Sequence, residues 1–143
     1  MKMKVFGSFP LLSIPVALYN VFSMSTGDGA IRPVQLNSLL FRISMPAGEN
    51  VLWTITWGDF LLTLSLAFLF WELVRSVMPG RTAILNHALS MGLFILCMVE
   101  FLLFSRFATS VFFLITLMTL LDVLAGFIVT IGASRRDISL AKD

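Results

Sequence analysis

The chain has 143 residues, 58% of them hydrophobic and 13% charged, and its formal net charge is +2. Soluble domains carry about 25% charged residues, and a water-soluble fold of this size would be unable to bury so much apolar side chain. The composition therefore predicts an integral membrane protein whose first partner is the lipid bilayer. Nucleic-acid binding is not expected, because the few basic residues are scattered along the chain.

The counts of metal-binding and redox-active residues restrict the chemistry further. The sequence contains one cysteine, Cys97, and one histidine, His87. An internal disulfide, a CxxC redox motif, a zinc site of several thiolates and a haem held by two histidines of one chain are therefore excluded. We expect no cofactor, no metal site and no catalytic residues.

The first apolar segment, residues 5–24, has the length of a membrane span and no charged residue. A bilayer core of about 30 Å needs about 20 residues of helix. Pro10 and Pro15 interrupt the segment, so we expect a retained helix that is kinked there. The alternative is a secretory signal, since two lysines precede the apolar run and Ser23 and Ser25 suit a cleavage site. Under either interpretation the second segment enters the membrane from the outside.

Residues 26–57 are expected to lie outside the membrane and to contain a β-hairpin. Large apolar residues alternate with polar ones over 41–45, then large residues recur at every second position over 51–57, and residues 46–50 form a Pro/Gly turn. A short helix over 34–40 is also compatible with the sequence. The alternation predicts one common apolar face, made of Phe41, Ile43, Met45, Val51, Trp53, Ile55 and Trp57.

This apolar face has two compatible interpretations. An isolated two-stranded hairpin is marginally stable in water, so we expect it to pack on the outer end of the helices or on a partner. As a cap it would cover the bundle, with two tryptophans at the membrane–water interface. As a docking surface it would bind a periplasmic or membrane partner. The candidate docking face consists of Phe41, Ile43, Val51, Trp53, Ile55 and Trp57.

Three more apolar segments, residues 58–78, 83–104 and 109–131, are predicted to span the membrane. Few residues separate the last two, which must form a tight antiparallel hairpin. Together with 5–24 they predict an all-α membrane protein: a four-transmembrane-helix bundle in a single domain, residues 1–143, with a small β-hairpin in the first extracytoplasmic loop.

The distribution of basic residues predicts the orientation. Seven basic residues share the side of the two termini: Lys2, Lys4, Arg75, Arg81, Arg135, Arg136 and Lys142. Three lie on the other side: Arg32, Arg42 and Arg106. Both termini are therefore expected in the cytoplasm. The small, compact chain suggests a bacterial inner membrane.

Ionisable residues within the spans are costly and are candidate sites by default. Asp59 suits a helix N-terminus, where the dipole is positive. Glu72 has Arg75 three residues later on the same face and forms an ion pair with it, or pairs with His87 to carry a proton. Glu100 has no base within one helical turn, and Arg106 is its nearest candidate partner.

The fourth span carries a polar stripe. At 100° per residue, Asp122 falls on the same side as Thr116 and Thr119, opposite Phe113 and Leu117. Such a stripe must face protein or water rather than lipid. It indicates either hydrogen bonds between helices or a hydrophilic path. The candidate intramembrane polar site consists of Glu72, His87, Glu100, Asp122, Thr119 and Thr116.

These features favour a non-enzymatic accessory or scaffold subunit of a membrane assembly, with a membrane-protein partner or a homo-oligomer. The cytoplasmic parts are too small for a catalytic domain. The alternative is a small oligomeric transporter or channel that uses the intramembrane carboxylates to handle protons or cations. A membrane enzyme acting on a lipid or a quinone is the third and weakest hypothesis.

Overall fold

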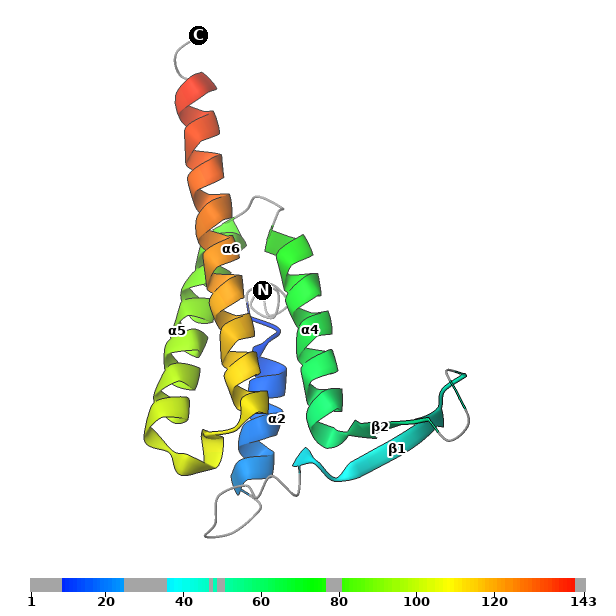
Figure 1. The fold of residues 1–143 in the computed structure, drawn as a ribbon. Coiled ribbons are helices and arrows are strands. Elements are labelled where there is room, and N and C mark those ends of the chain that lie inside the picture. The colour runs from blue at the N-terminus through cyan, green and yellow to red at the C-terminus, as the bar shows by residue number, and fades with distance from the viewer. Residues whose placement is uncertain (1–8, 25–35, 47, 49–50, 77–80, 141–143) are drawn as a thin grey trace, which may run out of the picture.

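The computed structural model describes residues 9–24, 36–46, 48, 51–76 and 81–140 (Figure 1). The side chains of 81–84 and 133–140 are outside this description. In chain order the elements are α2 (Ser13–Met24), β1 (Leu39–Ser44), β2 (Leu52–Thr56), α4 (Trp57–Ser76), α5 (Arg81–Leu103), the 3-10 helix η1 (Ser105–Phe107) and α6 (Ser110–Leu140). Helix α6 packs against α2, α4 and α5, so it is the central element of the helical part.

Three of the helices contain apolar stretches long enough to cross a bilayer. These stretches are Trp57–Ser76, Leu85–Leu103 and Ser110–Gly132, with 20, 19 and 23 residues. At about 1.5 Å per residue each matches the apolar thickness of a membrane, about 30 Å. The predicted segments 58–78, 83–104 and 109–131 are therefore confirmed as containing helices of spanning length, which supports an integral membrane protein. Residues 77 and 78 lie outside the described part.

The first predicted span is corrected. Helix α2 has 12 residues and is about 18 Å long, which is too short to cross a bilayer by itself. The predicted helix over 5–24 begins at Ser13; residues 5–8 lie outside the described part. Pro10 disfavours a helical conformation in the residue before it, and its carbonyl accepts a hydrogen bond from the Ser13 N–H in a turn (3.1 Å). Pro15 lies in the first helical turn, where a missing N–H costs nothing. The prolines therefore fix where α2 begins instead of kinking it.

Helix α6 is longer than predicted. It has 31 residues and ends at Leu140, whereas the sequence predicted an end near 131. In Figure 1 its last turns extend beyond the ends of α4 and α5. The apolar run that marks a span stops before the helix does, because hydropathy reports the lipid boundary and not the backbone hydrogen bonding.

The hydrophobic core lies around Tyr19, at the end of the helices next to the β-hairpin formed by β1 and β2; we call this the hairpin end. The Tyr19 ring is fully buried and lies 4.7 Å from the Phe112 ring and 5.7 Å from the Phe107 ring. Its hydroxyl shares a 2.6 Å hydrogen bond with Thr109 Oγ1, which satisfies the polar end of the buried ring. Helix α2 is thus an integral part of the fold. The core consists of Val16, Tyr19, Leu36, Leu61, Cys97, Phe107, Phe112 and Ile115.

The predicted β-hairpin is confirmed. Strands β1 and β2 are antiparallel, and the register pairs Phe41 with Ile55 and Ile43 with Trp53. Because directly paired residues share a face of the sheet, one face is apolar. The other face carries the pairs Arg42–Thr54 and Ser44–Leu52.

Two details of the hairpin prediction are wrong. The hairpin does not cap the bundle: it projects sideways from the start of α4 (Figure 1), and Phe41 and Trp53 remain 48% and 52% exposed. Trp57 does not continue β2 but is the first residue of α4. The possible short helix over 34–40 does not extend to its predicted end, because Leu39 and Leu40 belong to β1. Residues 34 and 35 lie outside the described part.

A capping box explains why the strand becomes a helix at Trp57. The Asp59 N–H donates to Thr56 Oγ1 (3.2 Å), and Asp59 Oδ2 accepts from the Thr56 N–H (3.0 Å) and hydroxyl (2.8 Å). Thr56 is therefore the N-cap and Asp59 the third helical residue of a reciprocal cap. The predicted capping role of Asp59 agrees with this geometry.

We predict that Thr56→Ala lowers the free energy of unfolding by about 1 kcal/mol, the usual loss for an N-cap. The measurement is unfolding of the purified protein in mixed detergent micelles. Thr63→Ala is the control, because the Thr63 hydroxyl donates to a carbonyl of its own helix, that of Asp59. Equal losses in the two variants would contradict the capping role.

Candidate functional site

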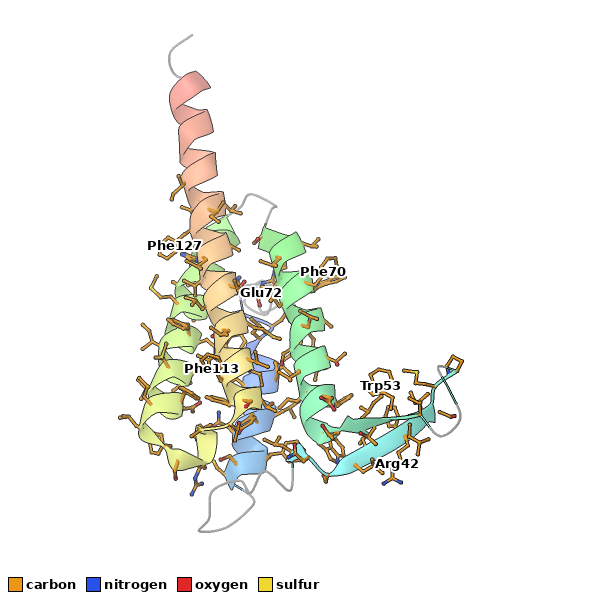
Figure 2. All side chains as sticks on the ribbon, viewed as in Figure 1. Arg42, Trp53, Phe70, Glu72, Phe113 and Phe127 are labelled. Atoms are coloured by element: carbon orange, nitrogen blue, oxygen red, sulfur yellow. The ribbon has the colours of Figure 1, made fainter. Side chains whose placement is uncertain are left out.

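The polar side chains remote from the hairpin gather between α4, α5 and α6, at the start of α2. We call this group the distal cluster; it comprises Glu72, Arg75, Asn86, His87, Ser90 and Asp122. Figure 2 shows Glu72 directed into the interior between the helices. The sequence nominated Glu72, His87 and Asp122 separately, and the structure brings them to one place.

Glu72, from a different helix, binds the turn that immediately precedes α2. Its side chain is 1% exposed, and Oε2 accepts hydrogen bonds from the backbone N–H groups of Leu11 (2.9 Å) and Leu12 (3.4 Å). The N–H groups at a helix start have no partner within the helix, and the dipole there is positive. The carboxylate thus supplies both acceptors and a compensating charge.

Asn86 connects Glu72 to Arg75. The Asn86 amide nitrogen donates to Glu72 Oε1 (3.1 Å), and its carbonyl oxygen accepts from Arg75 Nη2 (3.1 Å). The expected ion pair between Glu72 and Arg75 is therefore mediated by a side chain of α5. Sequence analysis missed Asn86, although its position next to His87 in a helix of spanning length was a visible signal.

His87 packs on α6. Its ring is nearly perpendicular to the Phe127 ring, with 4.6 Å between the centroids, and a Cβ built on Gly126 would overlap His87 Nδ1. Within the described part of the chain, neither ring nitrogen has a hydrogen-bond partner, although both are buried. The absence of a side chain at position 126 makes room for the imidazole.

Asp122 lies one helical turn before Gly126 and is 6% exposed. It lies near Ser90, whose buried hydroxyl has no hydrogen-bond partner in the described part of the chain, and within electrostatic range of His87 and Arg75. Asp122 also lies within electrostatic range of Glu72. Two buried carboxylates, one guanidinium and one imidazole therefore share this end of the fold.

The polar stripe of α6 faces the other helices, in agreement with the expectation that it faces protein or water and not lipid. Thr116 and Thr119 are buried, while Phe113 and Leu117 on the opposite side are exposed. The threonine hydroxyls donate to carbonyls of α6 itself, those of Phe112 (2.9 Å) and Thr116 (2.7 Å). Their polar atoms are thus satisfied by their own helix and not by bonds across the bundle.

Glu100 does not belong to the distal cluster. It lies toward the hairpin end, where Oε2 accepts a hydrogen bond from Asn20 Nδ2 (3.2 Å). The guanidinium of Arg106, its expected partner, reaches the Ser23 carbonyl at 3.5 Å. Glu100 therefore has a neutral partner from α2, which sequence analysis did not identify because 80 residues separate the two.

The candidate docking face is open. Trp53, Ile43 and Val51 are between 40% and 52% exposed, and Trp57 joins them from the first turn of α4 at 39%. Figure 2 shows Trp53 on the side of the hairpin along which α4 rises, and Arg42 on the opposite side. The adjoining flank of α4 is also apolar and exposed, through Phe60, Leu66, Phe70, Trp71 and Val74.

Metal binding has no structural support in the described ranges. They contain no group of three or more His, Cys, Asp or Glu side chains placed to hold an ion.

We predict that Glu72→Ala lowers the free energy of unfolding by at least about 3 kcal/mol. It removes the acceptor of three hydrogen bonds, and each buried group left unsatisfied costs about 1–3 kcal/mol. Detergent-micelle unfolding measures the loss. Glu100→Ala, which removes the acceptor of the Asn20 hydrogen bond at the other end, is the matched control. A loss at Glu72 no larger than that at Glu100 would show that the cap is unimportant.

A second prediction compares two glycines in spanning helices. Gly126→Ala should destabilise the fold by about 1–3 kcal/mol, because the new methyl group displaces His87 from a filled site. Gly92→Ala should be neutral or stabilise by up to about 1 kcal/mol, because a Cβ there meets nothing within 4 Å and alanine favours helix. The aggregation temperature of each variant in detergent measures its stability. A destabilisation of Gly92→Ala as large as that of Gly126→Ala would refute the packing argument.

No protein-family model, no curated protein and no solved structure matches this chain.

Proposed function

We propose that this chain is a non-enzymatic accessory or scaffold subunit of a membrane assembly, and that it binds a membrane-protein partner through the candidate docking face. The observation that carries the proposal is the hairpin, which extends away from the helices with its apolar face open. A two-stranded hairpin is marginal without further packing. A partner that covers Ile43 and Trp53 would supply that packing.

The occupant we propose is embedded in the membrane. The apolar face of the hairpin, marked by Trp53, turns to the side along which α4 rises, while Arg42 turns away (Figure 2). The open flank of α4, with Phe70 67% and Trp71 63% exposed, continues the same apolar surface. A helix of a neighbouring membrane protein fits a corner that is apolar on both sides, whereas a soluble periplasmic protein would meet the Arg42 side.

The proposed compartment is a bacterial inner membrane, with both termini in the cytoplasm. The excess of basic residues on the side of the termini supports this orientation. It would place the hairpin at the outer surface, where Trp53 and Trp57 suit the interface between lipid and water.

The second candidate function is a small oligomeric transporter or channel for protons or cations. The distal cluster favours it, because Glu72, Asp122 and His87 come from three different helices. Against it, Glu72 and Glu100 are both engaged by hydrogen bonds within the chain, as expected for groups that stabilise the fold.

The docking proposal is tested with photo-reactive residues placed in cells at Ile43, at its neighbour Ser44 on the opposite face, and at Phe70 on α4. We expect Ile43 and Phe70 to capture the same membrane protein, and Ser44 to capture it in much lower yield. Trp53→Ala should weaken binding by about 2 kcal/mol or more, as for a central aromatic residue. Thr54→Ala, on the other face, should have little effect.

Other outcomes are equally informative. Capture mainly from Ser44 would move the partner to the aqueous side and refute the membrane-embedded occupant. Adducts with lipid and no protein from either face would refute the docking role of the hairpin. Capture of a second copy of this chain would replace the hetero-assembly with a homo-oligomer.

A further inference from the structure

The distal cluster is unbalanced in charge when His87 is neutral. The titratable and charged groups of the described residues that meet there are Glu72 and Arg75 from α4, His87 from α5, and Asp122 from α6; residues 9–16 of the α2 segment contribute backbone N–H groups and no charge. With both carboxylates ionised, these described groups, two carboxylates and one guanidinium, have a net charge of −1. A buried charge without compensation is costly in apolar surroundings.

The compensation of the two carboxylates is unequal. Glu72 has three hydrogen-bond donors, the positive end of α2, and Arg75 through Asn86. Asp122 accepts no hydrogen bond that is resolved in the described structure; Ser90, His87 and Arg75 lie near it. Among the described residues, Asp122 is therefore the less compensated of the two carboxylates. His87, which packs on the same helix, has two buried ring nitrogens with no hydrogen-bond partner in the described structure.

The position of His87 next to Asp122 is built into α6. Gly126 follows Asp122 by four residues, so the two lie on the same face one turn apart. The missing side chain at Gly126 admits the imidazole, and the Phe127 ring packs against it at 4.6 Å. The ring is held against the helix that carries the carboxylate.

We propose that Asp122 and His87 form a proton-binding pair in which one exchangeable proton, held on the imidazole, neutralises the distal cluster. The bound species is an imidazolium beside a carboxylate, and the cluster then has a net charge of zero. Loss of the proton to water or to another base restores the neutral imidazole and the charge of −1. The pair differs from the Glu72–His87 pair that the sequence suggested, because Glu72 is committed to the start of α2. The inference does not depend on the docking proposal.

The test uses the fact that the chain contains one histidine. Protein labelled with ¹⁵N-histidine, in lipid nanodiscs at pH 7, gives ring signals from His87 alone, and these distinguish a doubly protonated ring from a neutral one. An isolated imidazole is largely neutral at this pH. We expect a doubly protonated ring in the wild type. In Asp122→Asn, the ratio of charged to neutral ring should fall by about tenfold or more, because a nearby opposite charge stabilises the charged form.

Two variants serve as controls. Glu100→Gln removes a carboxylate at the hairpin end and should leave the ring charged. Asp122→Glu keeps a carboxylate on the same face and should also leave it charged, which separates loss of charge from disturbed packing. A neutral ring in the wild type would overturn the proposal, and this result needs no variant to fold. A ring that stays charged in a folded Asp122→Asn protein would overturn it as well.

Discussion

The contact between the Glu72 carboxylate and the turn that leads into α2 organises the whole molecule. This turn lies inside the bundle, with Leu12 fully buried, so its N–H groups need partners from the protein. Glu72 accepts the N–H groups of Leu11 and Leu12 and is in turn held by Asn86 of α5. One side chain thereby connects α2, α4 and α5. The same contact fixes the depth at which Tyr19 enters the core, because the ring lies about two turns further along α2.

The buried rings and the buried carboxylates lie at different ends of the helices. The rings of Tyr19 and Phe112 belong to the core at the β-hairpin end, whereas Glu72 and Asp122 are buried at the distal end. Along α6, Thr116 and Thr119 are buried and donate their hydroxyls to carbonyls of their own helix. The exterior of the helices remains apolar, as a lipid-facing surface requires.

The sequence predicted the features that depend on local patterns. Hydropathy located three helices of spanning length, and alternation located both strands with the correct face. It failed where contacts between distant residues decide the outcome. The start of α2 depends on a carboxylate about 60 residues away, and the partner of Glu100 is an asparagine 80 residues away. The direction of the hairpin depends on the cap at Thr56, which ends β2 one residue earlier than the alternation suggests. Gathering Glu72, His87 and Asp122 required the packing of three helices, which no single-segment pattern encodes.

The burial of Cys97 has a practical consequence. It is the chain's one thiol, and it is fully enclosed by the core. A membrane-permeant thiol reagent can therefore modify the protein only when α5 separates from its neighbours, so the rate of alkylation measures how often the helices come apart. The native chain thus carries its own reporter of opening, usable in intact membranes and without any added probe.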